Sequence, residues 1–315
     1  MAATDALARK YRPQNWDEVF GNEALVSMIK QKLEDDALPH AILLIGEKGT
    51  GKTSVSRLMA KSLGCTEQNI FEYNMSDTNG VEDMRKIVST MYLSPVVERG
   101  GKKLKVYILD EFHRATPQAQ DCLLKPLEEP PDFIYWFLST TEQRKVIDTI
   151  QSRCARYETK PLAPREMNEL IDCILEAEGK EIDRKVQSKI VINSKGSSRN
   201  ALVALETIID IKDISLAIDL VDSGIENVDI LEVCRLLVKG GNDLWVKLAP
   251  MIDKVKIEPE TCRLSIMGYM ARVAINDPSK ASRMWLICDS FREVLHYNGK
   301  PGLIMQLINA CTVAK

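Results

Sequence analysis

The chain has 315 residues, of which 42 are Lys or Arg and 45 are Asp or Glu, so its formal net charge is −3. This balance argues against a generally basic nucleic-acid binder, because contact with DNA would need a local cationic stripe or several copies of the chain around one duplex. No apolar run approaches the roughly 18–20 residues of a membrane span, which excludes an integral membrane protein.

The cysteines and the N-terminus indicate the compartment. Eight cysteines are scattered singly and none forms a C-x-x-C pair, so the sequence indicates neither a structural zinc site nor a disulfide framework. Residues 1–5 lack a signal-peptide pattern. We therefore expect a reducing, cytoplasmic location without membrane contact.

The length of the chain leaves room for two or three domains. Its first half alternates strand-like segments with helical patterns. Four segments read as strands, residues 41–45, 70–75, 106–109 and 134–138, and the first of them is a continuous apolar run that reads as a buried strand. Helical spacing of apolar residues follows the first run over 54–63 and the second over 81–91. This alternation over residues 1–160 predicts an α/β domain in which helices cover a parallel sheet.

The segment after the first run is a complete phosphate-binding loop of the pattern G-x-x-x-x-G-K-T. It comprises Gly46, Glu47, Lys48, Gly49, Thr50, Gly51, Lys52 and Thr53, and Ser54 follows as a further nucleotide-binding residue. Glycines let backbone N–H groups wrap around phosphate oxygens, and the N-terminus of the following helix favours negative charge. Lys52 can reach the β- and γ-phosphates of ATP, and the Thr53 hydroxyl can ligate Mg²⁺.

An acidic pair, Asp110 and Glu111, directly follows the third apolar run. Asp110 can hold Mg²⁺ at the end of its strand, and Glu111 is placed to polarise an attacking water as a general base. Taken alone, such a pair is as often a solvated strand end. Together with the phosphate loop it predicts a nucleoside triphosphatase.

The β signals largely stop after the Lys-Pro-Leu-Ala-Pro stretch at 160–164. Residues 161–225 read as short helices and form a predicted helical lid domain. Within it, a serine of the Ser197-Ser198 pair can cap a helix and put Arg199 in the first turn. Residues 226–315 read as an all-helical third domain, which we interpret as an oligomerisation collar from its position alone.

These features together resemble the clamp loader ATPases of the AAA+ superfamily, the motor subunits that open ring-shaped sliding clamps and put them on primed DNA. The segments that carry the resemblance are 10–13 (Lys-Tyr-Arg-Pro), 74–85, 123–131 (Leu-Leu-Lys-Pro-Leu-Glu-Glu-Pro-Pro), 139–141 (Ser-Thr-Thr), 152–154 (Ser-Arg-Cys) and 196–202. The resemblance implies an AAA+ fold with a lid and a collar, and ATP and Mg²⁺ as cofactors. The implied partners are other loader subunits in a five-subunit assembly, a sliding clamp and primer–template DNA.

The resemblance also implies roles for single residues. Residues 10–13 together with 19–22 (Val-Phe-Gly-Asn) resemble the family's adenine-binding segment, and within it Tyr11, Arg12, Pro13 and Val19 are the expected nucleotide-binding residues. Thr140 is the expected first sensor, and Arg199 the second sensor and a catalytic cation. Arg153 of the Ser-Arg-Cys motif is expected to project into the neighbouring subunit's ATP site, where a cation supplied in trans stabilises charge on the transferred phosphoryl group. Arg85 lies on the helix that faces DNA in this family.

The chain departs from the bacterial loader subunit in two ways. It lacks a four-cysteine zinc module after the phosphate loop, where only Cys65 occurs, and it is shorter. Both departures suit a compact loader of phage or archaeal–eukaryotic type, and the Leu-Glu-Glu-Pro-Pro stretch leans bacterial, so we expect a phage protein acting in the host cytoplasm. Two alternatives stay open: an AAA+ helicase or helicase loader, such as a branch-migration motor, and a loader subunit that has lost its ATPase.

Overall fold

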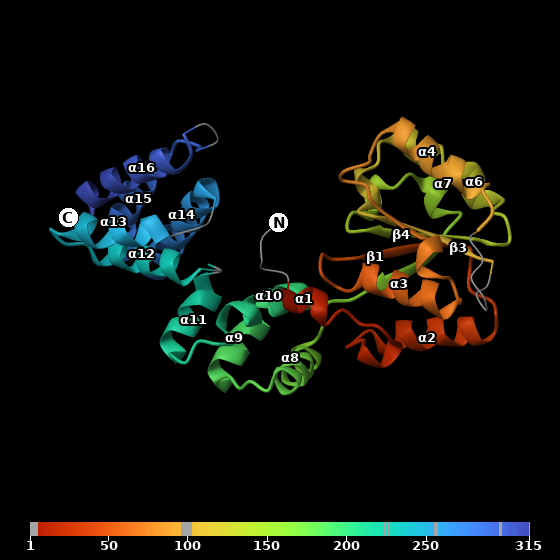
Figure 1. Ribbon diagram of the computed structural model, residues 1–315, viewed down its shortest axis with the longest axis horizontal. Coiled ribbons are helices and arrows are strands. Elements are labelled where there is room, and N and C mark those ends of the chain that lie inside the picture. The colour runs from red at the N-terminus through yellow and green to blue at the C-terminus, as the bar shows by residue number, and fades with distance from the viewer. Residues whose placement is uncertain are drawn as a thin grey trace. The chain divides into compact units, whose positions relative to one another are not determined.

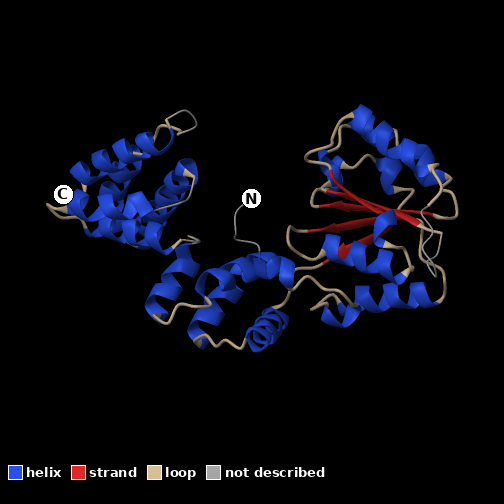
Figure 2. Ribbon diagram, viewed as in Figure 1, coloured by secondary structure: helices blue, strands red, loops and turns tan. Residues whose placement is uncertain are grey.

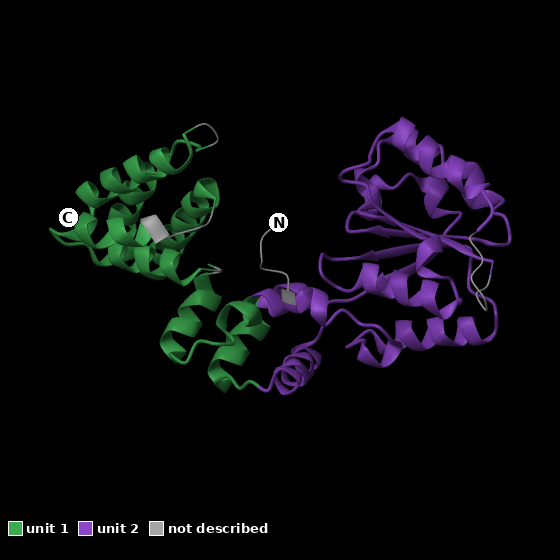
Figure 3. Ribbon diagram, in the orientation of Figure 1, with its two compact units in different colours: residues 1–4, 180–193, 204–315 green, residues 5–179, 194–203 purple. Residues whose placement is uncertain are grey.

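The computed structural model describes residues 6–95, 103–223, 225, 227–254, 258–295 and 298–314. The chain divides into two compact units, and each is described by itself (Figure 3). Unit 2 comprises residues 5–179 and 194–203; unit 1 comprises residues 1–4, 180–193 and 204–315. The division into three domains, with borders after residues 160 and 225, stays a prediction, and residues 1–5 and 226 at its borders lie outside the described residues.

Unit 2 contains a five-stranded parallel sheet with the strand order β2-β3-β4-β1-β5, which confirms the predicted α/β fold (Figure 2). The strands are β1 (Ala41–Gly46), β2 (Ile70–Asn74), β3 (Lys105–Asp110), β4 (Ile134–Thr140) and β5 (Ala155–Thr159). The α-helices are α1 (Ala6–Lys10), α2 (Glu23–Glu34), α3 (Lys52–Ser62), α4 (Val81–Met91), α5 (Pro117–Asp121), α6 (Leu124–Glu128), α7 (Asp148–Gln151) and α8 (Pro164–Glu178). Short 3-10 helices are η2 (Trp16–Glu18), η3 (Glu67–Asn69), η4 (Phe112–Arg114) and η5 (Gln143–Lys145).

Helices cover both faces of this sheet, which explains why its central strands are continuous apolar runs. Figure 1 shows α4, α6 and α7 over one face and α2 and α3 over the other. Neighbouring residues of β1 point to opposite faces: Leu43 packs in the same cluster as Met84 of α4, and Leu44 packs in the same cluster as Met59 of α3. All four side chains are fully buried.

The carboxyl ends of three neighbouring strands bring the functional segments to one edge of the sheet. β4 lies between β1 and β3, and these strands end at Thr140, Gly46 and Asp110. Because all strands are parallel, the three ends lie at the same edge. Ligand sites in sheets of this type form at that edge.

The sequence pattern misses β5, an edge strand that is only half buried. Its exposed positions are charged and alternate with buried Tyr157 and Thr159, so no continuous apolar run marks it. The strand nevertheless supports the phosphate loop. The hydroxyl of Thr159 lies 2.8 Å from that of Thr50, and this hydrogen bond fixes the loop against the sheet.

The described part of unit 1 is helical, and the chain passes from unit 2 into unit 1 within α10. Its helices are α9 (Arg184–Ser194), the end of α10 (Ser198–Ile208), α11 (Ile214–Ser223), α12 (Val228–Lys239), α13 (Leu244–Lys254), α14 (Pro259–Asn276), η6 (Pro278–Lys280), α15 (Ala281–Asp289) and α16 (Gly299–Val313). The apolar face of α12, with Ile230, Cys234 and Leu237, is buried as its spacing predicts. Within the described residues, no helix has both the length and the apolar character needed to cross a bilayer.

A matched pair of leucine substitutions tests the burial of β1. Leu44→Ala should lower the free energy of unfolding of unit 2 by about 2–5 kcal/mol, because it leaves a cavity under the strand that leads into the phosphate loop. Leu93→Ala, at a leucine that is 63% exposed, should change it by less than about 0.5 kcal/mol. Urea unfolding followed by fluorescence measures both, and equal effects would contradict this packing.

Candidate nucleotide-binding site

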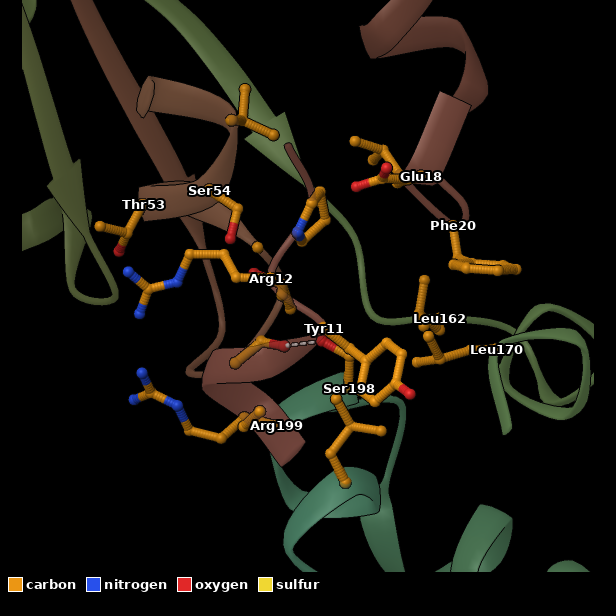
Figure 4. A pocket seen from close by; sticks show the side chains of 18 of the residues that line it. Tyr11, Arg12, Glu18, Phe20, Thr53, Ser54, Leu162, Leu170, Ser198 and Arg199 are labelled. Atoms are coloured by element: carbon orange, nitrogen blue, oxygen red, sulfur yellow. Dashed lines mark hydrogen bonds between the residues drawn. The ribbon is translucent and has the colours of Figure 1, made fainter. Parts of the chain in front are cut away.

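Unit 2 contains a cavity of about 470 Å³, a volume typical of small-molecule sites. Its walls come from five parts of the chain: residues 8–22, residues 48–55, the acidic pair at 110–111, Leu162 with residues 170–174 of α8, and residues 198–202 of α10. Figure 4 shows side chains from the N-terminal segment, the phosphate loop and the residues around α8 and α10 gathered around one space.

Glycines set the path of the phosphate loop at its two ends. Gly51 has a φ of +89° immediately before α3, a backbone conformation that favours glycine. A Cβ atom on Gly46 would collide with the backbone oxygen of Thr159 in β5. The loop therefore lies against β5 and turns directly into the N-terminus of α3, where unpaired N–H groups and the helix dipole favour a phosphate.

Lys52 is the buried cation of the loop. Its Nζ donates hydrogen bonds to the carbonyl oxygens of Gly46 at 2.9 Å and Glu47 at 2.7 Å. Burial lowers the pKa of Lys52, and Arg199 also lowers it, while the carboxylates at the end of β3 raise it. The ammonium group is thus held inside the loop, at the point where phosphate oxygens can take over as its partners.

Thr53 and Asp110 meet at the cavity wall. The Thr53 hydroxyl donates to Asp110 Oδ2 at 2.7 Å, and the other carboxylate oxygen accepts the N–H of Glu111 at 3.0 Å. A hydroxyl and a carboxylate this close fit Mg²⁺, which prefers oxygen ligands and commonly takes only one or two from the protein beside those of phosphates. The donor set therefore suits the metal predicted from the sequence.

Glu111 occupies a strained position beside this pair. Its backbone lies in the left-handed region, at φ 51° and ψ 41°, where a non-glycine residue costs about 1–2 kcal/mol. Its side chain lines the cavity and is 29% exposed, and its Oε2 lies 3.5 Å from Nε2 of His113. Backbone strain of this kind is retained mainly at functional positions.

One end of the cavity is apolar. Figure 4 shows Phe20, Leu162 and Leu170 gathered on the same side of the space. Tyr11 also lines the cavity, and its hydroxyl donates a 2.6 Å hydrogen bond to Glu178 of α8, which fixes the ring. Planar and aliphatic side chains of this kind suit the faces of a nucleobase.

The opposite end of the cavity is cationic. In Figure 4 the side chains of Arg12 and Arg199 both extend toward the side on which Thr53 lies. Arg199 sits in the first turn of α10, and its neighbour Ser198 donates a 3.1 Å hydrogen bond to the carbonyl of Gly49. The start of α10 is thereby tied to the phosphate loop, which holds Arg199 beside the loop.

Most of the predicted site residues meet in this cavity. Those that line it are Tyr11, Arg12, Pro13, Val19, Lys48, Gly49, Thr50, Gly51, Lys52, Thr53, Ser54, Asp110, Glu111 and Arg199. Gly46 and Glu47 contribute through the carbonyls that hold Lys52. Thr140 does not line the cavity; it is fully buried, and its hydroxyl lies 3.3 Å from Nδ1 of His113.

Arg153 and Arg85 lie outside the cavity of their own chain. Arg153 forms an ion pair with Glu128 at 3.1 Å and donates to the carbonyl of Thr149 at 2.9 Å. Arg85 is exposed on α4. Their expected roles toward a neighbouring subunit and toward DNA stay predictions.

The lining includes several apolar residues that are not predicted from the sequence. Leu170 and Ile174 line the cavity from α8, and their spacing of four residues is the signal that marks one helix face. Leu162 lies in the loop before that helix. Cys173 also lines the cavity, although nothing in the sequence sets it apart from the other scattered cysteines.

Comparison with known proteins gives sequence matches over most of the chain. A family model described as DNA polymerase III, delta subunit matches residues 73–163. The DNA polymerase III subunit gamma of Buchnera aphidicola subsp. Baizongia pistaciae is 34% identical over 64% of this chain and 60% of its own length. The subunit gamma/tau of Mycobacterium bovis is 32% identical over 65% of this chain and 39% of its own length. The chain thus spans less than two thirds of each of these relatives.

A longer match comes from the DNA polymerase III subunit gamma of Buchnera aphidicola subsp. Schizaphis graminum, which is 29% identical over 85% of this chain and 80% of its own length. Among solved structures, the RuvB Holliday junction branch migration motor of Thermotoga maritima matches 76% of this chain and 85% of its own, with a TM-score of 0.54 and 20% identity. At that identity the structural match supports the fold alone. The sequence relatives agree with the resemblance found in the sequence: the chain is similar to the gamma and gamma/tau subunits of bacterial DNA polymerase III.

Proposed function

We propose that the chain is the ATPase motor of a sliding-clamp loader, which binds and hydrolyses ATP with Mg²⁺ to open a clamp and load it on primer–template DNA. The observation that carries the proposal is the hydrogen bond between Thr53 and Asp110 at the cavity, with Lys52 and Glu111 beside it. These side chains supply a phosphate-binding cation, two metal-binding oxygens and a base, the parts that hydrolysis of a nucleoside triphosphate requires.

Hydrolysis follows from these positions. The oxygen of a water bonds to the γ-phosphorus, the bond from that phosphorus to the β–γ bridging oxygen breaks, and Glu111 accepts the proton of the water. Mg²⁺, when bound by Thr53 and Asp110, supplies positive charge for the phosphate oxygens. Lys52 and Arg199 stabilise the negative charge of the transferred group, and Thr140 acts as the sensor at the end of β4.

The adenine base binds at the apolar end of the cavity. Tyr11 and Val19 contribute from the N-terminal segment, and Phe20 and Leu162 extend the apolar surface. One nucleotide bound in this way would place its base at the apolar end and its phosphates at the cationic end. The family of the relatives supports nucleotide binding in general, and the lining supports this orientation.

The assembly proposed is a ring or spiral of loader subunits, five in number, in which Arg153 completes the ATP site of a neighbour. Arg153 does not line the cavity of its own subunit, and its side chain is 29% exposed, so a second subunit can reach it. A cation supplied in trans stabilises phosphoryl transfer strongly, which would make hydrolysis depend on assembly.

DNA binding would arise from the assembly and not from one subunit. Arg85 is exposed on α4, and several subunits around a duplex would present it repeatedly, which reconciles DNA contact with a net charge of −3. Such contacts go to phosphates, so they would be independent of base sequence and sensitive to salt. The cytoplasm is the proposed location, and a phage origin stays a prediction.

The proposal is tested by the ATPase rate of the wild-type protein assembled with its partner subunits. The rate is measured with a sliding clamp alone, with primed DNA alone, and with both. A rate that rises most when both are present is the expected result. Stimulation by branched DNA without any response to the clamp would favour a branch-migration motor instead.

Binding and hydrolysis of ATP should separate in two variants. Glu111→Gln keeps the shape of the side chain but loses the base, so ATP should stay bound while turnover falls at least about 100-fold. Lys52→Ala removes a charged hydrogen-bond donor and should weaken ATP binding about 10- to 150-fold. Fluorescent-nucleotide titration and phosphate release measure the two quantities separately.

Lys61→Ala is the matched control, because Lys61 is an exposed lysine in the last turn of the same helix, α3. It should leave both quantities unchanged. Wild-type turnover in purified Glu111→Gln would remove that residue from the proposed mechanism.

The role of Arg153 in trans can be tested by mixing. Arg153→Ala should fold normally and, in the assembly, lose about 10³-fold or more of its ATPase activity. Mixing it with Lys52→Ala should restore part of the activity, since each variant supplies what the other lacks at one interface. Arg156→Ala, at an exposed arginine of β5, is the control and should stay active. A loss of activity in monomeric Arg153→Ala relative to wild-type monomer would contradict the trans role.

A further inference from the structure

His113 lies between the acidic residue of the cavity and the end of β4. It belongs to η4, and its side chain is only 2% exposed. Its Nε2 lies 3.5 Å from Glu111 Oε2 and 3.4 Å from Glu142 Oε1, and its Nδ1 lies 3.3 Å from Thr140 Oγ1. One imidazole ring thus reaches both the proposed base and the proposed sensor.

The groups around the ring favour one neutral tautomer. Nε2 faces the carboxylates of Glu111 and Glu142, which can only accept, so a neutral ring carries its proton on Nε2. Nδ1 is then the acceptor, and the Thr140 hydroxyl, 3.3 Å away, donates to it. Burial lowers the pKa of His113 and favours this neutral ring, although the two carboxylates oppose the shift.

We propose that His113 is a positioning residue, which fixes the carboxylate of Glu111 for hydrolysis and links it to Thr140. Glu111 needs such support, because its backbone lies in the strained left-handed region while its side chain is partly exposed in the cavity. Glu142 is itself held by an ion pair with Lys145 at 2.9 Å, so it forms the fixed outer side of the same network. The inference rests on the ATPase function proposed above.

Two amide variants separate the two contacts of the ring. The amide of His113→Gln reaches the position of Nε2 and can still donate to Glu111. The amide of His113→Asn reaches only the position of Nδ1 and keeps the contact with Thr140. We expect His113→Asn to lower kcat about 10- to 100-fold, as a misplaced catalytic group does, and His113→Gln to stay within about 3-fold of wild type. Nucleotide affinity should stay within about 2-fold for both.

The kcat of each variant is measured by phosphate release, and nucleotide affinity by titration with N-methylanthraniloyl-ATP. His40→Asn is the matched control, since the Nδ1 of His40 contacts the carbonyl of Ile134 and the residue does not line the cavity; it should keep the wild-type kcat. Equal losses in both His113 variants together with weaker nucleotide binding would mean a packing role only and would overturn the proposal.

A measurement on the wild-type protein needs no variant of His113. The sequence has three histidines, so ¹⁵N-histidine labelling gives few signals, and substitution of His40 and His296 assigns the third. We expect the neutral Nε2–H form of His113 at neutral pH, and the Nδ1–H or the doubly protonated form would overturn the arrangement. Absence of wild-type ATPase would overturn the proposed function and this role together, whereas wild-type ATPase with full kcat in His113→Asn would overturn only this role.

Discussion

The hydrogen bond between Thr53 and Asp110 is the contact on which the rest of the site depends. These residues follow β1 and end β3, two strands that are separated by β4 in the sheet. The bond can form only because all three strands are parallel and end at one edge, so the strand order is itself a condition for the site. Loss of the order would leave a phosphate loop without its metal-binding carboxylate.

The sequence predicts the parts of the site that depend on local patterns. The phosphate loop, the acidic pair and the four predicted strand segments are contiguous, and the structure contains each of them near its expected place. The sequence misses β5, because the charged residues at its exposed positions interrupt the apolar pattern, and it misses Leu162, because the apolar end of the cavity is built from single residues far apart in the chain. These features depend on tertiary contacts and leave no local signal.

Charge within the cavity is balanced locally although the chain is slightly acidic. The cations of Lys52 and Arg199 share the cavity wall with the carboxylates of Asp110 and Glu111. Burial and Arg199 lower the pKa of Lys52, and the two carboxylates raise it. A bound triphosphate would bring phosphate oxygens that replace the loop carbonyls as partners of the Lys52 ammonium, so the buried charge would stay paired. The burial of Lys52 is therefore compatible with both binding and release of a nucleotide.

The remaining question is why a histidine should occupy the buried space behind Glu111. A lysine there would bring a full charge into a site with 2% side-chain exposure, and an amide could serve only one of the two contacts. A neutral imidazole has a donor and an acceptor on opposite sides of a rigid ring, and so it can join Thr140 of β4 to the carboxylate that follows β3. The ring thus extends the constraint set by the strand order from Thr53 and Asp110 to the proposed base, Glu111, and the proposed sensor, Thr140.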